Sequence, residues 1–85
     1  MTRDDVVALL RELLGDILEL APEEVGIEQD LIDELDADSL QRLELMTEVE
    51  HRLDVRLDAR AWHAARTVAE LAELTLRELA EPRAR

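Results

Sequence analysis

The sequence DSLQRLELMTEVEHRL, residues 38–53, decides the fold because it combines a helix start with a regular apolar stripe. Asp38 and Gln41 match a capping box, in which each side chain satisfies a free amide at the start of a helix. The apolar residues of one face recur at helical spacing and predict burial: Leu45, Met46, Val49 and Leu53. A second face is partly polar and contains Leu40, Glu44, Thr47, Glu48 and His51. The stretch therefore predicts an amphipathic helix with one face in a core and one in solvent.

An amphipathic pattern also precedes this stretch. Residues 3–18 predict a helix whose start Thr2 or Asp4 can cap. Its inward stripe is formed by Val6, Leu10, Leu13, Leu14 and Ile17.

Two further helical segments follow it. Residues 57–66 predict a short helical turn around Trp62. Thr67 and Glu70 match a second capping box, which opens a last helix that Pro82 limits. The inward positions of this last helix are Val68, Leu71, Ala72, Thr75 and Leu79.

The first two predicted helices are joined by an acidic connection of roughly residues 19–37, which contains Pro22 and Gly26. Connections this long in so small a domain tend to be functional. Apolar residues spaced along it predict that parts fold back on the helices: Val25, Ile27, Leu31, Ile32 and Leu35. We therefore predict an all-α fold over a single domain, residues 1–85. It is a small four-helix bundle with three main helices, one short helix and a long loop between helices 1 and 2.

Composition excludes several classes of function. The 85 residues hold 22 acidic and 10 basic side chains, all of the latter arginine, for a net charge of −12. Nucleic acids and anionic lipids both need a basic face, so neither is an expected partner. The absence of cysteine excludes a disulfide scaffold, a thiolate zinc site and a cysteine nucleophile. The short apolar runs predict neither a membrane span nor a signal peptide, and we expect a cytoplasmic protein.

The negative charge is concentrated in one part of the chain. Residues 1–58 hold eighteen acidic residues and five arginines, whereas residues 59–85 hold four acidic residues and five arginines. Such a concentration usually serves solubility and less often marks a surface that basic partners recognise.

No metal site is expected. The carboxylates between Asp30 and Asp38 do not form an EF-hand loop, because Gln41 stands where that loop needs glycine and Thr47 where it needs glutamate. The two histidines, His51 and His63, have only carboxylates as possible co-ligands.

Ser39 is the remaining residue of chemical interest. A hydrolase built on it would lack a glycine-rich elbow and the room for an oxyanion hole, so we expect no catalytic residues and no enzyme. Ser39 follows the predicted N-cap, where a phosphodiester would lie beside free amides and the positive end of the helix dipole. From helix physics alone, the simpler interpretation is an exposed and inert residue.

The residues around Ser39 resemble a known motif. Leu35-Asp36-Ala37-Asp38-Ser39-Leu40 is similar to the Leu-Gly-Ala-Asp-Ser-Leu attachment motif of acyl carrier proteins, and Leu43-Glu44-Leu45 to its Val-Glu-Leu continuation. Thr67-Val68 resembles the pair that opens the last helix of that family. The resemblance runs from about residue 4 to 80. Peptidyl carriers usually have glycine before the serine, so Asp38 favours the acyl branch.

The resemblance implies a prosthetic group. Ser39, flanked by Asp38 and Leu40 in the motif, would carry 4′-phosphopantetheine, installed from coenzyme A by a phosphopantetheinyl transferase with Mg²⁺. Acyl cargo would be held as a thioester on the terminal thiol of this arm, so the reactive sulfur belongs to the group and not to the protein.

The resemblance further implies that the helix after Ser39 is recognised by basic patches on partner enzymes of the ketosynthase, acyltransferase or ligase type. The predicted partner face contains Leu40, Leu43, Glu44, Thr47, Glu48 and His51. Its carboxylates would steer the encounter and its leucines would give apolar contact. The alternative is a solvated face stabilised by pairs such as Glu48 and Arg52.

The chain departs from the family pattern at several positions. Asp36 replaces the usual glycine, and Leu31 stands where many members have phenylalanine. Trp62 and His63 replace small or charged residues, and Trp62 either narrows an acyl cavity between helices or fills space left by missing phenylalanines. These differences favour a polyketide or other secondary-metabolite carrier at least as much as a fatty-acid carrier.

We predict a free-standing, monomeric acyl carrier protein. Two alternatives stay open, a non-carrier acidic adaptor that binds basic protein partners and an aminoacyl or peptidyl carrier.

Overall fold

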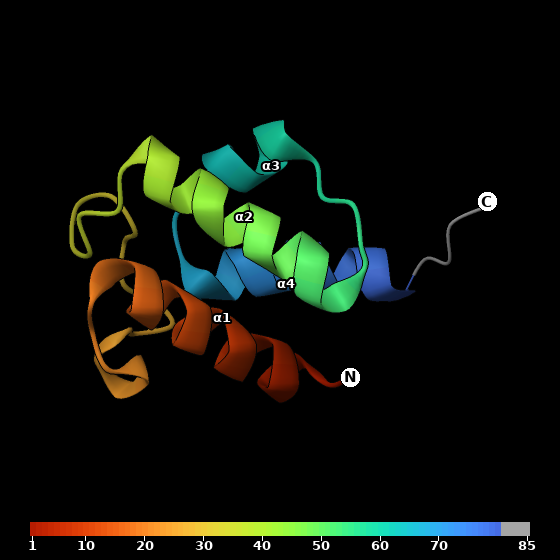
Figure 1. Ribbon diagram of the computed structural model, residues 1–85, viewed down its shortest axis with the longest axis horizontal. Helices are drawn as coiled ribbons and strands as arrows, with labels where there is room; N and C mark the ends of the chain where they lie inside the picture. The colour runs from red at the N-terminus through yellow and green to blue at the C-terminus, as the bar shows by residue number, and fades with distance from the viewer. Residues whose placement is uncertain (81–85) are drawn as a thin grey trace.

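The computed structural model describes residues 1–80, which form four α-helices and one short 3₁₀ helix and contain no β-strand (Figure 1). The helices are α1 (Arg3–Leu18), η1 (Pro22–Glu24), α2 (Ser39–Leu53), α3 (Ala59–Ala64) and α4 (Val68–Ala80). Three long helices, one short helix and a long connection after α1 confirm the predicted fold class. Pro82 lies outside the described residues. Among residues 1–80 no helix is long and apolar enough to cross a lipid bilayer.

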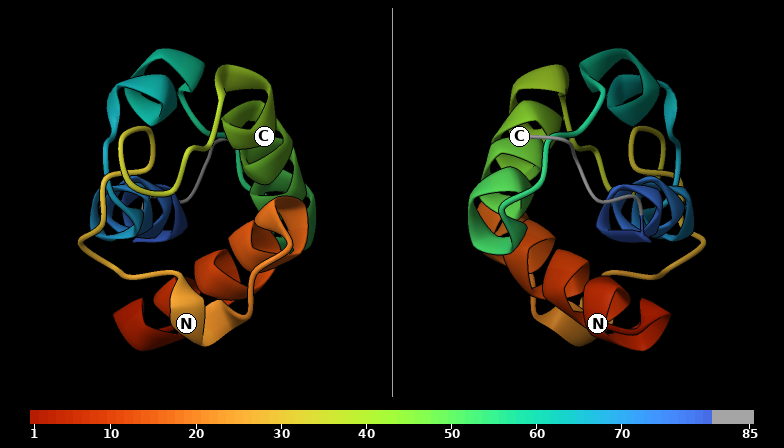
Figure 2. Two further views of the ribbon diagram at one scale, coloured as in Figure 1. Left: turned by 90° about the vertical axis from the view of Figure 1, so that its left-hand side faces the viewer. Right: turned by 90° about the vertical axis from the view of Figure 1, so that its right-hand side faces the viewer.

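The four α-helices surround a shared core when the bundle is viewed end on (Figure 2). α1 packs against both α2 and α4, and α3 bridges α2 and α4 on the opposite side. The core is aliphatic except for Trp62, which has no exposed surface. The predicted inward stripes face the core, although Ile17, Leu53 and Leu79 are only partly buried against it. Val7 of α1, which the stripe left out, is buried as well.

Side-chain caps define the helix starts as the sequence predicts. Thr2 caps α1 in a box with Asp5. At α4 the Thr67 hydroxyl accepts the amide of Glu70 at 3.1 Å, as predicted. The carboxylate of Glu70 accepts a hydrogen bond from the amide of Arg66, one residue before the expected position.

The connection between α1 and α2 folds back on the bundle, as its apolar residues predict. Val25 and Leu31 are fully buried. The amide of Leu31 donates to the carbonyl of Arg66 at 2.7 Å, and the amide of Ala69 donates to the carbonyl of Ile27 at 3.1 Å. These two bonds fasten the connection to the segment that joins α3 to α4, so it has a defined course despite its length.

Candidate functional site

Ser39 is the first residue of α2 and is exposed. The capping box forms as predicted, since the amide of Gln41 donates to Asp38 Oδ1 at 2.8 Å and the amide of Asp38 donates to Gln41 Oε1 at 3.0 Å. The box leaves the amides of Ser39 and Leu40 at the open end of the helix, where helices lack internal acceptors. An anionic group on the Ser39 hydroxyl would therefore lie beside unpaired amides and the positive end of the helix dipole.

The backbone just before Ser39 turns sharply at Asp36. Asp36 has a φ of 56°, in the left-handed region that glycine adopts freely and that aspartate tolerates better than most residues. The next residue, Ala37, is buried, and its amide donates to the carbonyl of Leu31 at 2.8 Å. Asp36 thus keeps a backbone conformation suited to glycine, and the turn anchors Ala37 while Asp38 and Ser39 remain outside.

Two aspartates of the connection hold it to the rest of the molecule. Asp30 accepts from Arg66 through both carboxylate oxygens, at 2.9 Å from Nε and 3.0 Å from Nη2, and Asp33 accepts from Nη2 at 3.2 Å. Asp30 also accepts the amides of Asp33 and Ile32. The hydrogen bond from the Asp33 amide is the main cause that lowers the pKa of Asp30, with smaller contributions from Ile32 and Arg66.

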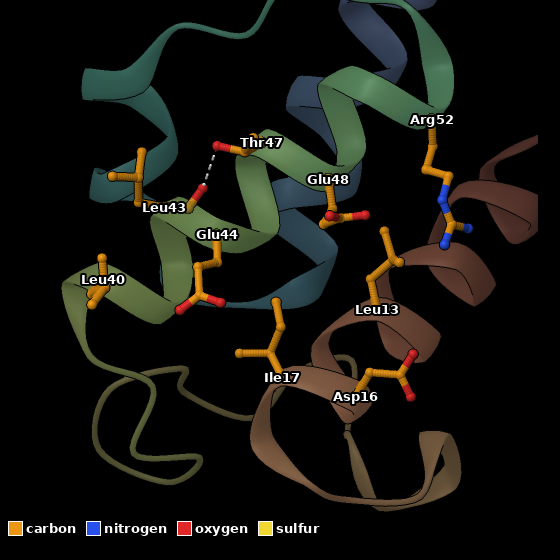
Figure 3. A pocket seen from close by; sticks show the side chains of 9 residues that line it. All are labelled: Leu13, Asp16, Ile17, Leu40, Leu43, Glu44, Thr47, Glu48 and Arg52. Carbon is orange, nitrogen blue, oxygen red and sulfur yellow. Dashed lines mark hydrogen bonds between the residues drawn. The ribbon is translucent and has the colours of Figure 1, made fainter.

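The outer face of α2 borders a groove of about 620 Å³ between α1 and α2, which we call the α1–α2 groove (Figure 3). It contains five residues of the predicted partner face: Leu40, Leu43, Glu44, Thr47 and Glu48. Leu40 and Leu43 are 64% and 41% exposed, so they present apolar surface to solvent. The sixth residue, His51, is exposed on α2 but does not line the groove.

Four groove residues were not predicted as part of a site: Leu13, Asp16 and Ile17 of α1 and Arg52 of α2. The amphipathic pattern of α2 cannot show which helix borders its polar face, and so it gave no signal for the residues of α1. Thr47 is polar by type, but its hydroxyl donates to the carbonyl of Leu43 at 3.0 Å (Figure 3). Its methyl group is then the part left for apolar contact.

The opposite flank of α2 is closed against α3 by Arg42, Trp62 and His63, which we call the α2–α3 seam. The indole Nε1 of Trp62 donates to the carbonyl of Arg42 at 2.8 Å. The guanidinium of Arg42 donates from Nη1 to the carbonyl of His63 at 3.1 Å. Arg42 is only 9% exposed, and its burial was not predicted because its charge favours solvent.

The chain matches the family described as the phosphopantetheine attachment site over residues 8–80. The chain is 29% identical over 70 residues to the meromycolate extension acyl carrier protein of Mycolicibacterium smegmatis, which covers 82% of this chain and 71% of that protein. It is 26% identical to an acyl carrier protein of Rhodococcus erythropolis, and the match covers 82% of this chain and 77% of that protein. A shorter match is to polyketide-8 synthase acyl carrier protein 2 of Streptomyces avermitilis, with 44% identity over 48 residues. This match covers 56% of this chain and 55% of that protein.

Solved structures share the fold. An A1-type ACP domain from module 5 of MLSA1 superposes with a TM-score of 0.77 at 23% identity, covering 89% of this chain and 76% of that one. An HMG-ACPI domain from the CurA module of Lyngbya majuscula gives a TM-score of 0.77 at 20% identity, covering 93% and 80%. Because the family match spans most of the chain, the protein belongs to the acyl carrier protein family, whose prosthetic group is 4′-phosphopantetheine.

Proposed function

We propose that Ser39 carries the 4′-phosphopantetheine arm and that the chain is a free-standing carrier of acyl intermediates. The observation that supports this most is the exposed Ser39 hydroxyl at the amino end of α2, inside the region that matches the family. Ser39 is also the only serine in the sequence. No other residue of this type competes for the attachment.

In this proposal the residues around Ser39 have separate tasks. When bound, the arm supplies a thiol that holds an acyl group as a thioester. Asp38 caps α2 and thereby defines the start of the helix that bears Ser39, and the amides of Ser39 and Leu40 would lie beside the phosphodiester. The bond to Arg66 through Asp30 holds the preceding connection in place, so the arm starts from a defined point. The protein itself catalyses nothing in this scheme.

The α1–α2 groove is the proposed docking surface for partner enzymes. Asp16, Glu44 and Glu48 outnumber Arg52 and give it negative charge, and Leu40 and Leu43 add exposed apolar surface at its edge. A complementary partner surface is basic with apolar side chains at its centre, and opposite charges would speed and orient the encounter. The proposed partners are a phosphopantetheinyl transferase and enzymes of the ketosynthase, acyltransferase or ligase type.

The relatives support a role in polyketide, secondary-metabolite or fatty-acid synthesis. One is named for meromycolate extension and another for a polyketide synthase, and the latter has the higher identity over its shorter match. We propose polyketide synthesis as the first pathway to test. We also propose that the protein works as a monomer in the cytoplasm.

Intact mass after incubation with coenzyme A, Mg²⁺ and a promiscuous phosphopantetheinyl transferase tests the attachment. The wild type should gain one phosphopantetheine group, and Ser39→Ala should gain none. Glu12→Gln, at an exposed position of α1 that does not line the α1–α2 groove, should load like the wild type. No mass gain in the wild type, or a gain that persists in Ser39→Ala, contradicts the proposal. The first result would favour the acidic adaptor instead.

A further inference from the structure

The charged side chains that line the α1–α2 groove have no partner among the described residues. They are all exposed: Asp16, Glu44, Glu48 and Arg52. None of the four forms an ion pair or a side-chain hydrogen bond within residues 1–80. Glu48 and Arg52 are four residues apart, a spacing at which helix side chains commonly pair, yet no ion pair joins them. These charges are therefore available to a partner and are not used to stabilise the face itself.

The charge changes sign along the groove. Because α2 rises about 1.5 Å per residue, Glu44 and Glu48 lie about 8 and 14 Å along the helix from Ser39. Arg52 lies about 20 Å from Ser39 on the same scale. Figure 3 shows Leu40 at one end of the groove and Arg52 at the other. Arg52 is the only basic residue among the nine described residues that line the groove. A partner that fills the groove therefore meets carboxylates of α2 first and a guanidinium at the end remote from Ser39.

The shape of the groove suits one helix of a partner. α1 and α2 run in opposite directions and form its two walls (Figure 1). Leu40 and Arg52 are twelve residues apart, so the groove is about 18 Å long, which equals three to four helical turns. Both walls contribute apolar side chains: Leu13 and Ile17 from α1, and Leu40 and Leu43 from α2. Grooves of this kind take the apolar face of an amphipathic helix.

We propose that the α1–α2 groove receives one amphipathic, mainly basic helix of a partner enzyme, and that Arg52 selects helices with a carboxylate at the end remote from Ser39. The proposal rests on the docking surface proposed above and does not depend on the attachment at Ser39. A helix that is basic along its whole length would place like charge against Arg52, and such a contact disfavours the wrong partner. Arg52 is then a specificity-determining residue, whereas Glu44 and Glu48 attract basic partners in general.

A series of synthetic peptides tests this with the full chain. The parent peptide is a helix of about fourteen residues with a leucine stripe flanked by lysines, and each variant replaces one lysine with glutamate. Fluorescence anisotropy at low salt gives the Kd of each labelled peptide. Glutamate should weaken binding at positions that face the acidic side chains of the groove. At one end of the peptide it should tighten binding by about two- to fivefold, the range expected of an exposed ion pair.

Substitutions of Arg52 then identify the source of this preference. Arg52→Glu should reverse it, so that the peptide with the end glutamate binds more weakly than the parent. Arg52→Gln should abolish the preference without adding a negative charge, and it serves as the second variant if Arg52→Glu does not fold. Arg60→Glu is the matched control, because it makes the same charge change at an exposed position of α3 outside the groove. It should keep the preference of the wild type.

Leu43→Asp locates the peptide. It places a charge on the exposed apolar surface of the groove and should weaken binding of the parent peptide at least about tenfold. Binding that is unchanged in this variant would place the peptide elsewhere and overturn the proposal.

Three further outcomes overturn it. One is a wild type in which glutamate weakens binding at every position, and another is a preference that persists in both Arg52 variants. The third is a wild type that binds none of the peptides. The intact-mass measurement tests the attachment at Ser39 separately, so a carrier that loads normally but lacks the end-glutamate preference loses this inference alone.

Discussion

The two flanks of α2 differ in almost every physical respect. Toward α1 the helix borders an open groove, with exposed Leu40 and Leu43 beside Glu44 and Glu48. Toward α3 it is closed by buried side chains and by two hydrogen bonds between Arg42 and the Trp62–His63 segment. One helix therefore presents apolar and acidic side chains to solvent on one side and is packed and hydrogen-bonded against α3 on the other. Substitutions on the side toward α1 should therefore cost less stability than substitutions on the side packed against α3.

The largest effect on stability should come from removing a buried side chain between α2 and α3. Trp62→Ala removes a fully buried indole and should lower the free energy of unfolding by about 3–5 kcal/mol, as measured by urea denaturation. Leu43→Ala on the open flank should change it by less than about 0.5–1 kcal/mol, because its side chain is already partly hydrated. Equal losses in the two variants would show that the flanks do not differ as described.

A smaller effect, on binding only, should come from reversing charge on the open flank. Glu44→Arg with Glu48→Arg should reduce kcat/KM of the phosphopantetheinyl transferase at low salt by about tenfold or more, since steering charge is lost. The loss should shrink as salt is added. Glu12→Arg with Glu73→Arg makes the same change in net charge at exposed positions that do not line the groove, and it should have a much weaker effect. An equal effect of both pairs would mean that net charge, and not the groove, governs the encounter.

The smallest effect concerns the connection between α1 and α2, where Asp30 contributes to stability in a pH-dependent way. The pKa of Asp30 is held below its ordinary value of 3.8, chiefly by the amide of Asp33. A carboxylate with a lowered pKa in the folded state stabilises the fold above the pKa it has when unfolded, and this contribution is lost as the pH falls through the lowered value. Asp30→Ala should therefore be less stable than the wild type at pH 7, by a difference that narrows below about pH 4.

Urea denaturation at a series of pH values measures this difference. A gap between Asp30→Ala and the wild type that stays constant down to about pH 2 would show that the ionised carboxylate is not what holds the connection.

The closed flank was also the harder one to predict from sequence. Helix starts and stripes follow from local rules, so Asp38, Gln41 and the inward leucines were assigned correctly. The burial of Arg42 depends on α3 folding over it, which no local pattern of α2 contains. Likewise, Asp16 and Ile17 belong to the groove only because α1 crosses beside α2.

The connection between α1 and α2 was predicted in part. Its apolar residues correctly predicted that it folds back, whereas its bond to Arg66 joins positions 36 residues apart and has no signature in either segment. The left-handed backbone of Asp36 was not predicted, although the glycine usual at this position in the family adopts that conformation freely.

The single aromatic residue gives the closed flank a built-in optical reporter. Trp62 is the only tryptophan, and neither tyrosine nor phenylalanine contributes to the ultraviolet emission of this chain. Its indole is fully buried and hydrogen-bonded to α2, so its fluorescence spectrum should shift to the red only when α3 parts from α2. Events on the open flank, such as the docking of a partner without tryptophan, should leave the spectrum nearly unchanged. Unlabelled protein can thus reveal which side of α2 a given ligand disturbs.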